Sequence, residues 1–188
     1  MRSEKEKIYD AWLAASARLG DRQALSLLAE RWNARLLAHA CRLTGEPELA
    51  ADVTQEAWTQ IIKGIAGLDD ADAFAAWAFR IVTRRCARAI KSRQRRRAGI
   101  AALGREPQPN LDRVDLASLG EQQTDLAVIQ AAMRELPPDQ RAALALFYLE
   151  DFRVAEIAVA LDAPVGTIKT RLMHARRKLR AKLQGESQ

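Results

Sequence analysis

Apolar residues recur at intervals of three and four positions through most of residues 8–98, and this spacing constrains the fold more than any other feature. Leu28, Trp32 and Leu36 illustrate it, each about one helical turn after the last. Such spacing places apolar side chains on one face of an α-helix, whereas a half-buried strand alternates apolar and polar residues. No segment of the chain alternates apolar and polar residues over a length sufficient for such a strand. The sequence therefore predicts an all-α protein.

The helical pattern weakens between residues 99 and 123. Gly104, Pro107 and Pro109 interrupt the periodicity there, and the composition becomes polar. Glycine and proline at this density mark a linker rather than a packed element. We therefore expect two small helical domains joined by a flexible linker, with boundaries at residues 1–98, 99–123 and 124–188.

Basic residues are concentrated in two short segments of the 188-residue chain. Nine lysines or arginines and no acid lie between residues 80 and 97, and seven more without an acid lie between residues 169 and 182. The formal net charge is +6. Two basic surfaces on one chain suit two contacts with a nucleic-acid backbone.

The sequence carries no pattern typical of membrane or secreted proteins. Its N-terminus is charged, and no run approaches the roughly 18 apolar residues that a membrane-spanning helix needs. Hydrophobic residues make up 48% of the chain, which is ample for a packed core. We expect a cytoplasmic protein with no membrane insertion.

The chemistry-bearing side chains do not form a catalytic or metal-binding pattern. Cys41 and Cys86 are isolated, and His39 lies two positions from Cys41, so the two point in different directions on a helix. No nucleophile, metal set or phosphate-binding glycine loop accompanies the carboxylates of Asp52 and Glu56. We therefore expect no cofactor, no metal and no enzymatic activity.

Residues 154–183 have the pattern of a helix-turn-helix. A short first helix contains the small residue Ala158, where the two helices must approach closely. Asp162 stands at the turn, a position that is usually glycine and often left-handed, which Asp tolerates better than most residues. Ile168 and Leu172 then begin a buried stripe along the second helix.

The opposite and flanking faces of that second helix are polar and basic, as a DNA-reading helix requires. A solvated basic helix on an ordinary bundle is the alternative, but the turn, the small residue and the buried stripe together favour DNA binding. The candidate DNA-contacting residues are Thr167, Lys169, Thr170, Arg171, His174, Arg176, Arg177 and Lys178.

Several motifs along the chain, in order, resemble a known family. They are Gly20-Asp21, Ala51-Asp52-Val53-Thr54-Gln55-Glu56, Phe74-Ala75-Ala76-Trp77, Leu136-Pro137, Glu156-Ile157-Ala158 and Gly166-Thr167-Ile168-Lys169-Thr170-Arg171-Leu172. Together they resemble the extracytoplasmic-function (ECF) subfamily of sigma-70 RNA polymerase sigma factors. No single motif is decisive, but the similarity covers nearly the whole chain.

The resemblance implies a function for each domain. Residues 1–98 correspond to sigma region 2, which binds core RNA polymerase and the −10 promoter element, and residues 124–188 correspond to region 4, which reads the −35 element. Asp52, Gln55 and Glu56 share one helix surface and match the polymerase-binding segment. An acidic surface cluster without a partner is the alternative. The resemblance also implies an anti-sigma factor as a partner.

The basic segment after Trp77 corresponds to the part of the family that engages the −10 element. A solvated basic tract is its alternative. Trp77 could stack on an unpaired base, but its spacing from Phe74 favours the core. The candidate residues for −10 contacts are Arg80, Arg84, Arg85, Arg88 and Lys91.

The chain departs from the family pattern at positions that bear on DNA recognition. Arg84 and Arg88 stand where many members have Asn and Asp, which favours phosphate contacts over base readout. Asp162 replaces the usual glycine of the turn. Arg153 stands where a Ser or Thr helix cap is common, at a cost of about 1 kcal/mol unless Asp151 caps instead.

Two other functions are compatible with parts of the sequence. A stand-alone LuxR-like regulator shares the helix-turn-helix, but it needs neither Leu136-Pro137 nor the Asp52–Glu56 segment. An adaptor whose N-terminal bundle binds only protein has no need of the basic segment between residues 80 and 97. The sequence favours the sigma factor.

Overall fold

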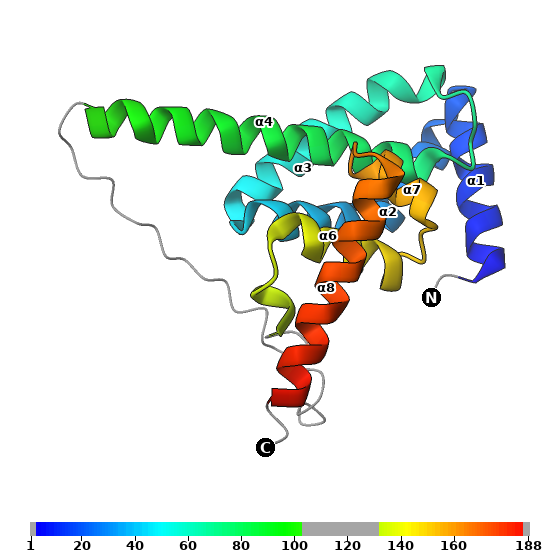
Figure 1. Cartoon of the computed structure of the whole chain (residues 1–188). Coiled ribbons are helices and arrows are strands. Elements are labelled where there is room, and N and C mark those ends of the chain that lie inside the picture. The colour runs from blue at the N-terminus through cyan, green and yellow to red at the C-terminus, as the bar shows by residue number, and fades with distance from the viewer. Residues whose placement is uncertain (1–2, 103–131, 186–188) are drawn as a thin grey trace, which may run out of the picture.

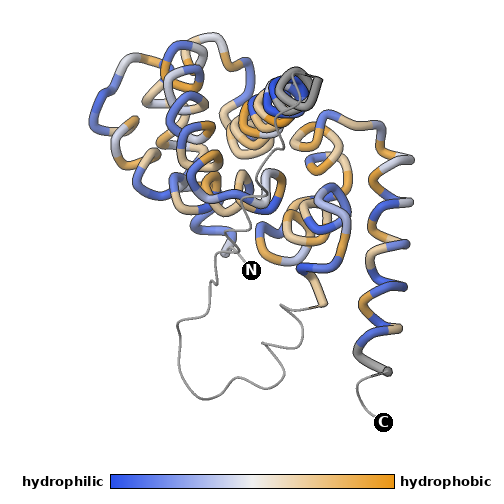
Figure 2. Tube along the Cα trace, turned by 90° about the vertical axis from the view of Figure 1, so that its left-hand side faces the viewer, coloured by the Kyte–Doolittle hydropathy of each residue, from blue (hydrophilic) through white to orange (hydrophobic). Residues whose placement is uncertain are grey.

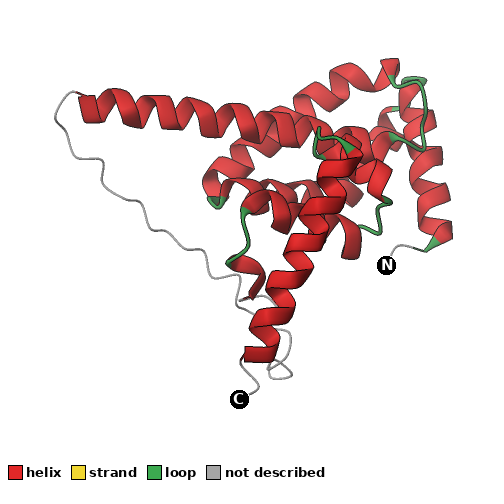
Figure 3. Ribbon diagram, viewed as in Figure 1, coloured by secondary structure: helices red, strands yellow, loops and turns green. Residues whose placement is uncertain are grey.

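The computed structural model describes residues 3–102 and 132–185, and all the regular structure in these ranges is helical (Figures 1 and 3). This confirms the all-α class. The elements are α1 (Glu4–Arg18), α2 (Arg22–Thr44), α3 (Pro47–Gly64), the 3-10 turn η1 (Ile65–Gly67), α4 (Phe74–Ala102), α6 (Pro138–Tyr148), α7 (Val154–Ala160) and α8 (Val165–Gly185).

Local sequence signals account for the starts and ends of the first helices. The side chain of Ser3 accepts a hydrogen bond from the backbone N–H of Glu6 and thereby caps α1. In return, the carboxylate of Glu6 accepts a hydrogen bond from the backbone N–H of Ser3. The carboxylate of Asp21 accepts hydrogen bonds from the first backbone N–H groups of α2. Gly45 ends α2 with a φ of 72°, a left-handed conformation that glycine adopts without a steric cost. Pro47 then occupies the first turn of α3.

Helices α1 to α4 enclose an aromatic core. Trp32 of α2 is almost fully buried, and it meets the edges of Phe74 and Phe79 of α4 with ring centroids 6.0 and 6.1 Å apart. Leu28 and Leu36 extend this core along α2. In Figure 2 each helix carries both hydrophobic and hydrophilic residues along its length, as amphipathic helices do.

Helices α6, α7 and α8 form the second helical unit, and it packs against the first. Helix α7 lies on α4, and α6 lies on α2 (Figure 1). Phe79 of α4 meets Phe152, just before α7, edge to face at 5.4 Å. The buried residues of both units therefore form one continuous hydrophobic cluster.

Helix α4 is the longest described helix, and its second half projects away from the other helices (Figure 1). It continues to Ala102, four residues past the expected end of the first domain at residue 98. The rest of the expected linker, residues 103–123, and the start of the second domain up to residue 131 lie outside the described residues. Within the described ranges, no helix combines the length and apolar character needed to cross a bilayer.

Candidate nucleic-acid interface

The helix-turn-helix is formed by α7, the four-residue connection 161–164 and α8. Asp162 in the turn has a φ of 50°, which confirms the left-handed backbone expected at this position. The N–H groups of Asp162 and Ala163 donate to carbonyls of α7 at 3.2 and 3.0 Å and close the end of that helix. Ile157 and Ile168 are fully buried and join the two helices. Backbone geometry and apolar packing thus fix the angle between α7 and α8.

Arg153 is the N-cap residue directly before helix α7, and its side chain makes no capping hydrogen bond. Instead the carboxylate of Glu156, in the first turn, accepts a hydrogen bond from the backbone N–H of Arg153 at 2.6 Å. Asp151, the other candidate cap, forms an ion pair with Lys7 at 2.9 Å. Glu156 therefore compensates in part for the missing Ser or Thr cap.

Helix α8 buries one stripe and exposes the rest of its surface. Ile168, Leu172 and Ala175 are buried, and the eight candidate DNA-contacting residues are exposed or half-buried around them. The helical spacing separates these residues into two flanks on either side of Arg177. On one flank a groove of about 520 Å³ lies between α8 and the side chains of Phe147 and Val154. The residues of α8 that line it are Lys169, Leu172, Met173, Arg176, Arg177 and Arg180.

Some of these polar side chains already contact their own domain. The guanidinium of Arg176 lies over the rings of Phe147 and Tyr148, 5.0 and 5.6 Å from their centroids. Arg171 forms an ion pair with Asp139 of α6 at 2.9 Å. These two arginines therefore support the domain as well as presenting positive charge.

Two other candidate residues interact with each other on the exposed side of α8. Arg177 Nη2 lies 3.3 Å from Nδ1 of His174, one turn earlier. The hydroxyl of Thr170 donates to the carbonyl of Gly166 at 3.0 Å, so its oxygen remains able to accept. Arg177, His174 and Thr170 are thus the central polar residues of the face opposite the buried stripe.

The second basic surface is a stripe along α4. Arg80, Arg84, Arg88 and Lys91 are spaced by four, four and three positions, so they lie on one side of the helix. Arg85 lies on a different side. Its guanidinium donates to Glu56 of α3 at 2.7 Å and to Gln60 at 3.2 Å. The structure therefore separates Arg85 from the other candidate residues for −10 contacts.

The start of the α4 stripe meets the turn of the helix-turn-helix. Asp162 accepts hydrogen bonds from Arg80 at 3.0 Å and from Arg84 at 2.9 and 3.2 Å. The hydrogen bond from Arg84, supported by Arg80, lowers the pKa of the Asp162 carboxyl, and the same bond raises the pKa of Arg84. Arg84 and Asp162, which are 78 positions apart in the sequence, are therefore partners in the folded protein.

The candidate polymerase-binding surface lies on the solvent side of α3. Asp52, Gln55 and Glu56 are all exposed there. Ile62, six positions after Glu56 on the same helix, is also exposed, with 52% of its surface accessible. Sequence inspection overlooked Ile62, although its position off the buried stripe of α3 was a usable signal. An exposed apolar side chain on the same helix as exposed carboxylates and an amide suits a protein–protein contact.

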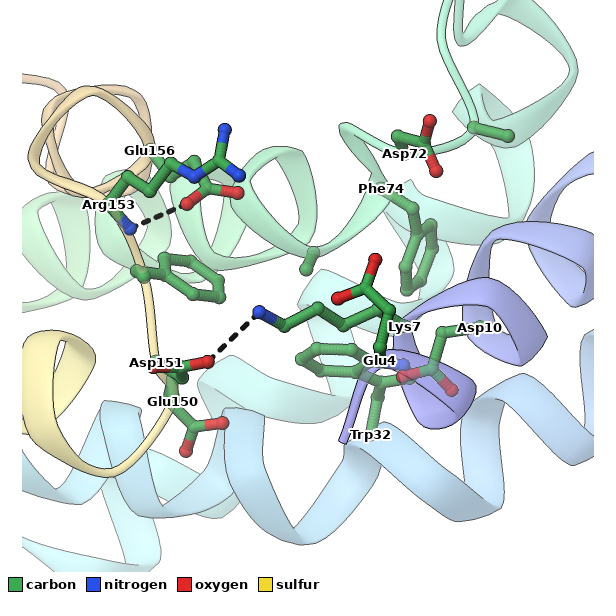
Figure 4. Close-up of a pocket in the computed structure, with 13 residues that line it drawn as sticks. Glu4, Lys7, Asp10, Trp32, Asp72, Phe74, Glu150, Asp151, Arg153 and Glu156 are labelled. Atoms are coloured by element: carbon green, nitrogen blue, oxygen red, sulfur yellow. Dashed lines mark hydrogen bonds and ion pairs between the residues drawn. The ribbon is translucent and has the colours of Figure 1, made fainter. Parts of the chain in front are cut away.

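A pocket of about 290 Å³ lies at the junction of the two helical units (Figure 4). Glu4, Asp72 and Glu156 line it from three different elements, and the ion pair of Lys7 with Asp151 crosses it. None of its lining residues is a serine, cysteine or histidine.

The cysteines and His39 lie in apolar surroundings. Burial raises the pKa of the Cys86 thiol to about 12, and burial likewise raises the pKa of Cys41. Protonated thiols are poor nucleophiles and poor metal ligands. Among the described residues, no group of three or more His, Cys, Asp or Glu side chains is placed to hold a metal ion.

Comparison with family models matches both helical units. Residues 28–96 match sigma-70 region 2, and residues 126–179 match sigma-70 region 4. Region 2 includes α3 and the basic stripe of α4, and region 4 includes the helix-turn-helix. This pairing does not favour the alternative of a stand-alone LuxR-like regulator.

Similar solved structures share the fold. RpoE of Bartonella quintana, solved with the anti-sigma factor NepR, has a TM-score of 0.63 at 24% identity and covers 85% of this chain and 96% of its own. CnrH, solved with the cytosolic domain of CnrY, has a TM-score of 0.61 at 24% identity and covers 94% and 98%.

Curated relatives are similar along nearly their whole length. The sigma-H factor of RNA polymerase from Pseudomonas aeruginosa is 25% identical over 93% of this chain and 94% of its own. The ECF RNA polymerase sigma factor SigM of Mycobacterium tuberculosis is 33% identical over 94% of this chain and 85% of its own. With both sigma-70 regions matched in order, the chain belongs to the extracytoplasmic-function family of RNA polymerase sigma factors, which direct promoter-specific transcription initiation.

Proposed function

We propose that this sigma factor contacts the two ends of its promoter with α8 and with the basic stripe of α4. The observation that carries the proposal is that both basic segments lie on helices that expose their charged sides. A helix-turn-helix places the N-terminal part of its second helix in the major groove. Thr167, Thr170 and His174 of α8 then face the base edges of the −35 element, and Arg177 follows one turn later.

The remaining basic residues of α8 have a different role. Lys169, Arg171, Arg176 and Lys178 flank the central face, where they meet the phosphates on either side of the groove. Arg171 and Arg176 are held by Asp139 and by two aromatic rings, which suits fixed phosphate contacts better than base reading. Such contacts fix orientation and contribute affinity that falls with salt.

The stripe formed by Arg80, Arg84, Arg88 and Lys91 serves the −10 element in this proposal. Its four positive charges follow one side of α4 and can track the backbone of a single strand. The half-buried Trp77 packs against the core, which supports a structural role for it. The −10 contacts therefore rest mainly on phosphates.

Asp52, Gln55, Glu56 and Ile62 form the proposed surface for core RNA polymerase. Its carboxylates suit a basic partner surface, and Ile62 adds the apolar area that a stable interface needs. Glu56 also holds Arg85, so part of its charge is used within the sigma factor. Asp52 is the more available carboxylate.

The solved sigma factors with a similar fold are complexes with anti-sigma proteins. We extend this to the present chain and propose an anti-sigma factor as its regulator. The protein acts as an initiation factor without enzymatic activity of its own and requires no cofactor. Its site of action is the cytoplasm, where bacterial RNA polymerase works.

Run-off transcription with supplied core polymerase on genomic fragments tests the proposal. Wild-type protein should direct transcripts from a small set of promoters, and Asp52→Lys should abolish them by placing a cation against the basic partner. Glu30→Lys is the matched control, because Glu30 is exposed on the side of α2 that faces away from its buried stripe. Undiminished transcription by Asp52→Lys would show that this face does not bind polymerase.

A further inference from the structure

Helix α1 is apolar on two opposite faces. Leu13 and Ala17 lie on the face that is buried against the bundle. Ile8, Trp12 and Leu19 lie about half a turn away from them, and all three are exposed. The helix forms an edge of the molecule, so this second face points into solvent (Figure 1). An amphipathic helix needs only one apolar face to pack on its own domain. The second face therefore suits a contact with another molecule.

The exposed residues follow a line along the whole length of α1. Ile8, Trp12, Ala15 and Leu19 are spaced by four, three and four positions, as in the apolar seam of a coiled coil. Such a seam packs against one further helix along its length. The spacing therefore points to a helix as the occupant of this face.

The aromatic side chains of this face are already held in position. The rings of Tyr9 and Trp12 are stacked, with centroids 5.9 Å apart and 13° between their planes. The guanidinium of Arg31 lies over the ring of Tyr9, 5.1 Å from its centroid. Fixed side chains lose little conformational entropy when a partner covers them. Trp12 therefore has the character of an interface anchor.

The exposed apolar area is large enough for a weak dimer. The exposed fractions of Ile8, Tyr9, Trp12 and Leu19 are 64%, 41%, 58% and 90%. At about 150–250 Å² for a large side chain, the four expose roughly 500 Å² together. An apolar patch of this size marks an interaction site. Two such patches facing each other bury about 1,000 Å², which is the lower limit for a specific interface.

The α1 seam is complementary to a second copy of itself. In an antiparallel pair related by a two-fold axis, Trp12 faces the partner's Ala15, and Ile8 faces the partner's Leu19. A large ring thus meets a small side chain at the centre, and aliphatic side chains meet at both ends. The two-fold symmetry makes each of these contacts twice.

The charges at the two ends of α1 favour the antiparallel direction. The first turn carries Glu4 and Glu6 beside Lys5, whereas Arg18 lies in the last turn and Arg22 just beyond it. An antiparallel pair brings the acidic end of each helix to the basic end of the other, and it also opposes the two helix dipoles. A parallel pair would place like ends together.

We propose that two copies of the free sigma factor associate through the exposed faces of α1 and form a symmetric, antiparallel dimer. The limited area makes it a reversible dimer of micromolar affinity rather than a permanent one. This inference goes beyond the proposed function and rests on none of its contacts, since it uses no residue of α3, α4 or α8.

Sedimentation equilibrium of the full-length protein tests the inference. Between about 1 and about 100 µM, the weight-average mass of the wild type should rise from that of one chain towards that of two. Ile8→Glu and Trp12→Glu each bury a carboxylate in the apolar contact, and each should raise the dimer dissociation constant by at least about tenfold. Ile62→Glu is the matched control, because Ile62 is a comparably exposed isoleucine on α3, and it should dimerise like the wild type.

Ile8→Glu leaves the Tyr9–Trp12 pair intact, so it keeps the test valid if Trp12→Glu loses its fold, which circular dichroism reports. A wild type that stays monomeric up to about 100 µM would overturn the dimer. A dimer that persists in both glutamate variants would place the contact elsewhere and overturn the role of α1. If the wild type is monomeric and Trp12→Glu weakens binding of core polymerase, the polymerase covers this face, and the second copy is excluded. None of these results changes the meaning of the Asp52→Lys experiment.

Discussion

The hydroxyl of Thr83 donates to the carbonyl of Ala160 at 2.7 Å, across the junction between the two helical units. The same oxygen lies 2.9 Å from Nε2 of His39. Because the only hydroxyl proton is used on a carbonyl, which cannot donate, Nε2 of His39 must carry the proton. His39 is therefore a neutral donor, and its Nδ1 is buried with no hydrogen-bond partner among the described residues.

His39 should make the stability of the protein depend on pH. Burial lowers its pKa from 6.5 to about 3. In the unfolded chain the imidazole binds a proton near pH 6.5, so between about pH 6.5 and 3 the unfolded state holds more protons. The stabilising contribution of neutral His39 is complete above pH 6.5 and is lost as the pH falls. From pH 7 to pH 5 the free energy of unfolding should decrease by about 2 kcal/mol, measured by urea denaturation.

His39→Gln is the control for this effect, because the amide nitrogen of Gln can still donate to Thr83 and does not titrate. Its free energy of unfolding should change much less between pH 7 and pH 5. An equal pH dependence in the wild type and in His39→Gln would assign the effect to the carboxylates.

Thr83→Val should lower the free energy of unfolding of the protein by about 1–3 kcal/mol. Val has nearly the same shape, but it leaves the N–H of His39 and the carbonyl of Ala160 without their partner in a buried region. Thr83→Ser keeps the hydroxyl and should retain most of the stability. Urea unfolding of both variants at pH 7 provides the comparison, and equal midpoints for Val and Ser would contradict the importance of this bond.

Local features of this fold could be predicted from the sequence, because they depend on residues close together in the chain. The spacing of Leu28, Trp32 and Leu36 predicted a buried helix face, and all three are buried. The turn at Asp162 was predicted from a single position. The bond between Arg84 and Asp162 could not be predicted, because 78 positions separate them and only the packing of α7 on α4 brings them together.

The same limit applies to individual site residues. Arg84 and Arg85 are neighbours in a uniformly basic segment, and composition alone does not distinguish them. A helix turns by about 100° per residue, so one faces the helix-turn-helix and the other faces α3. Only the arrangement of the neighbouring helices shows that Arg85 pairs with Glu56.

Arg85→Gln and Arg88→Gln should therefore have different effects. Arg88 is exposed on the α4 stripe, and its loss should reduce the salt dependence of single-strand binding by about 0.7, as for one phosphate contact. Arg85→Gln should leave that slope unchanged and alter the affinity for core polymerase, because it releases Glu56. Anisotropy with labelled DNA and with labelled core enzyme measures the two affinities. A reduced salt dependence of single-strand binding in Arg85→Gln would show instead that Arg85 belongs to the surface that binds the −10 element.

Arg176 and Arg177 are adjacent on α8, and alanine at each should affect a different property. Arg176 lies over Phe147 and Tyr148, so its loss removes two cation–π contacts and should lower the free energy of unfolding by roughly 0.5–1 kcal/mol. Arg177 is exposed near His174, and its loss should leave the unfolding midpoint nearly unchanged.

Binding of the holoenzyme to promoter DNA also distinguishes these two variants. Arg177→Ala should weaken holoenzyme binding to the identified −35 element by about 1–3 kcal/mol, and it should narrow the preference for that element over a scrambled one. Arg176→Ala should weaken binding to both sequences to a similar extent, because a phosphate contact carries no sequence information. Competition binding with the two duplexes measures the preference directly. If Arg176→Ala instead reduces the preference for the −35 element over the scrambled sequence, the face of α8 that reads bases lies on the side of the groove lined by Phe147 and Val154.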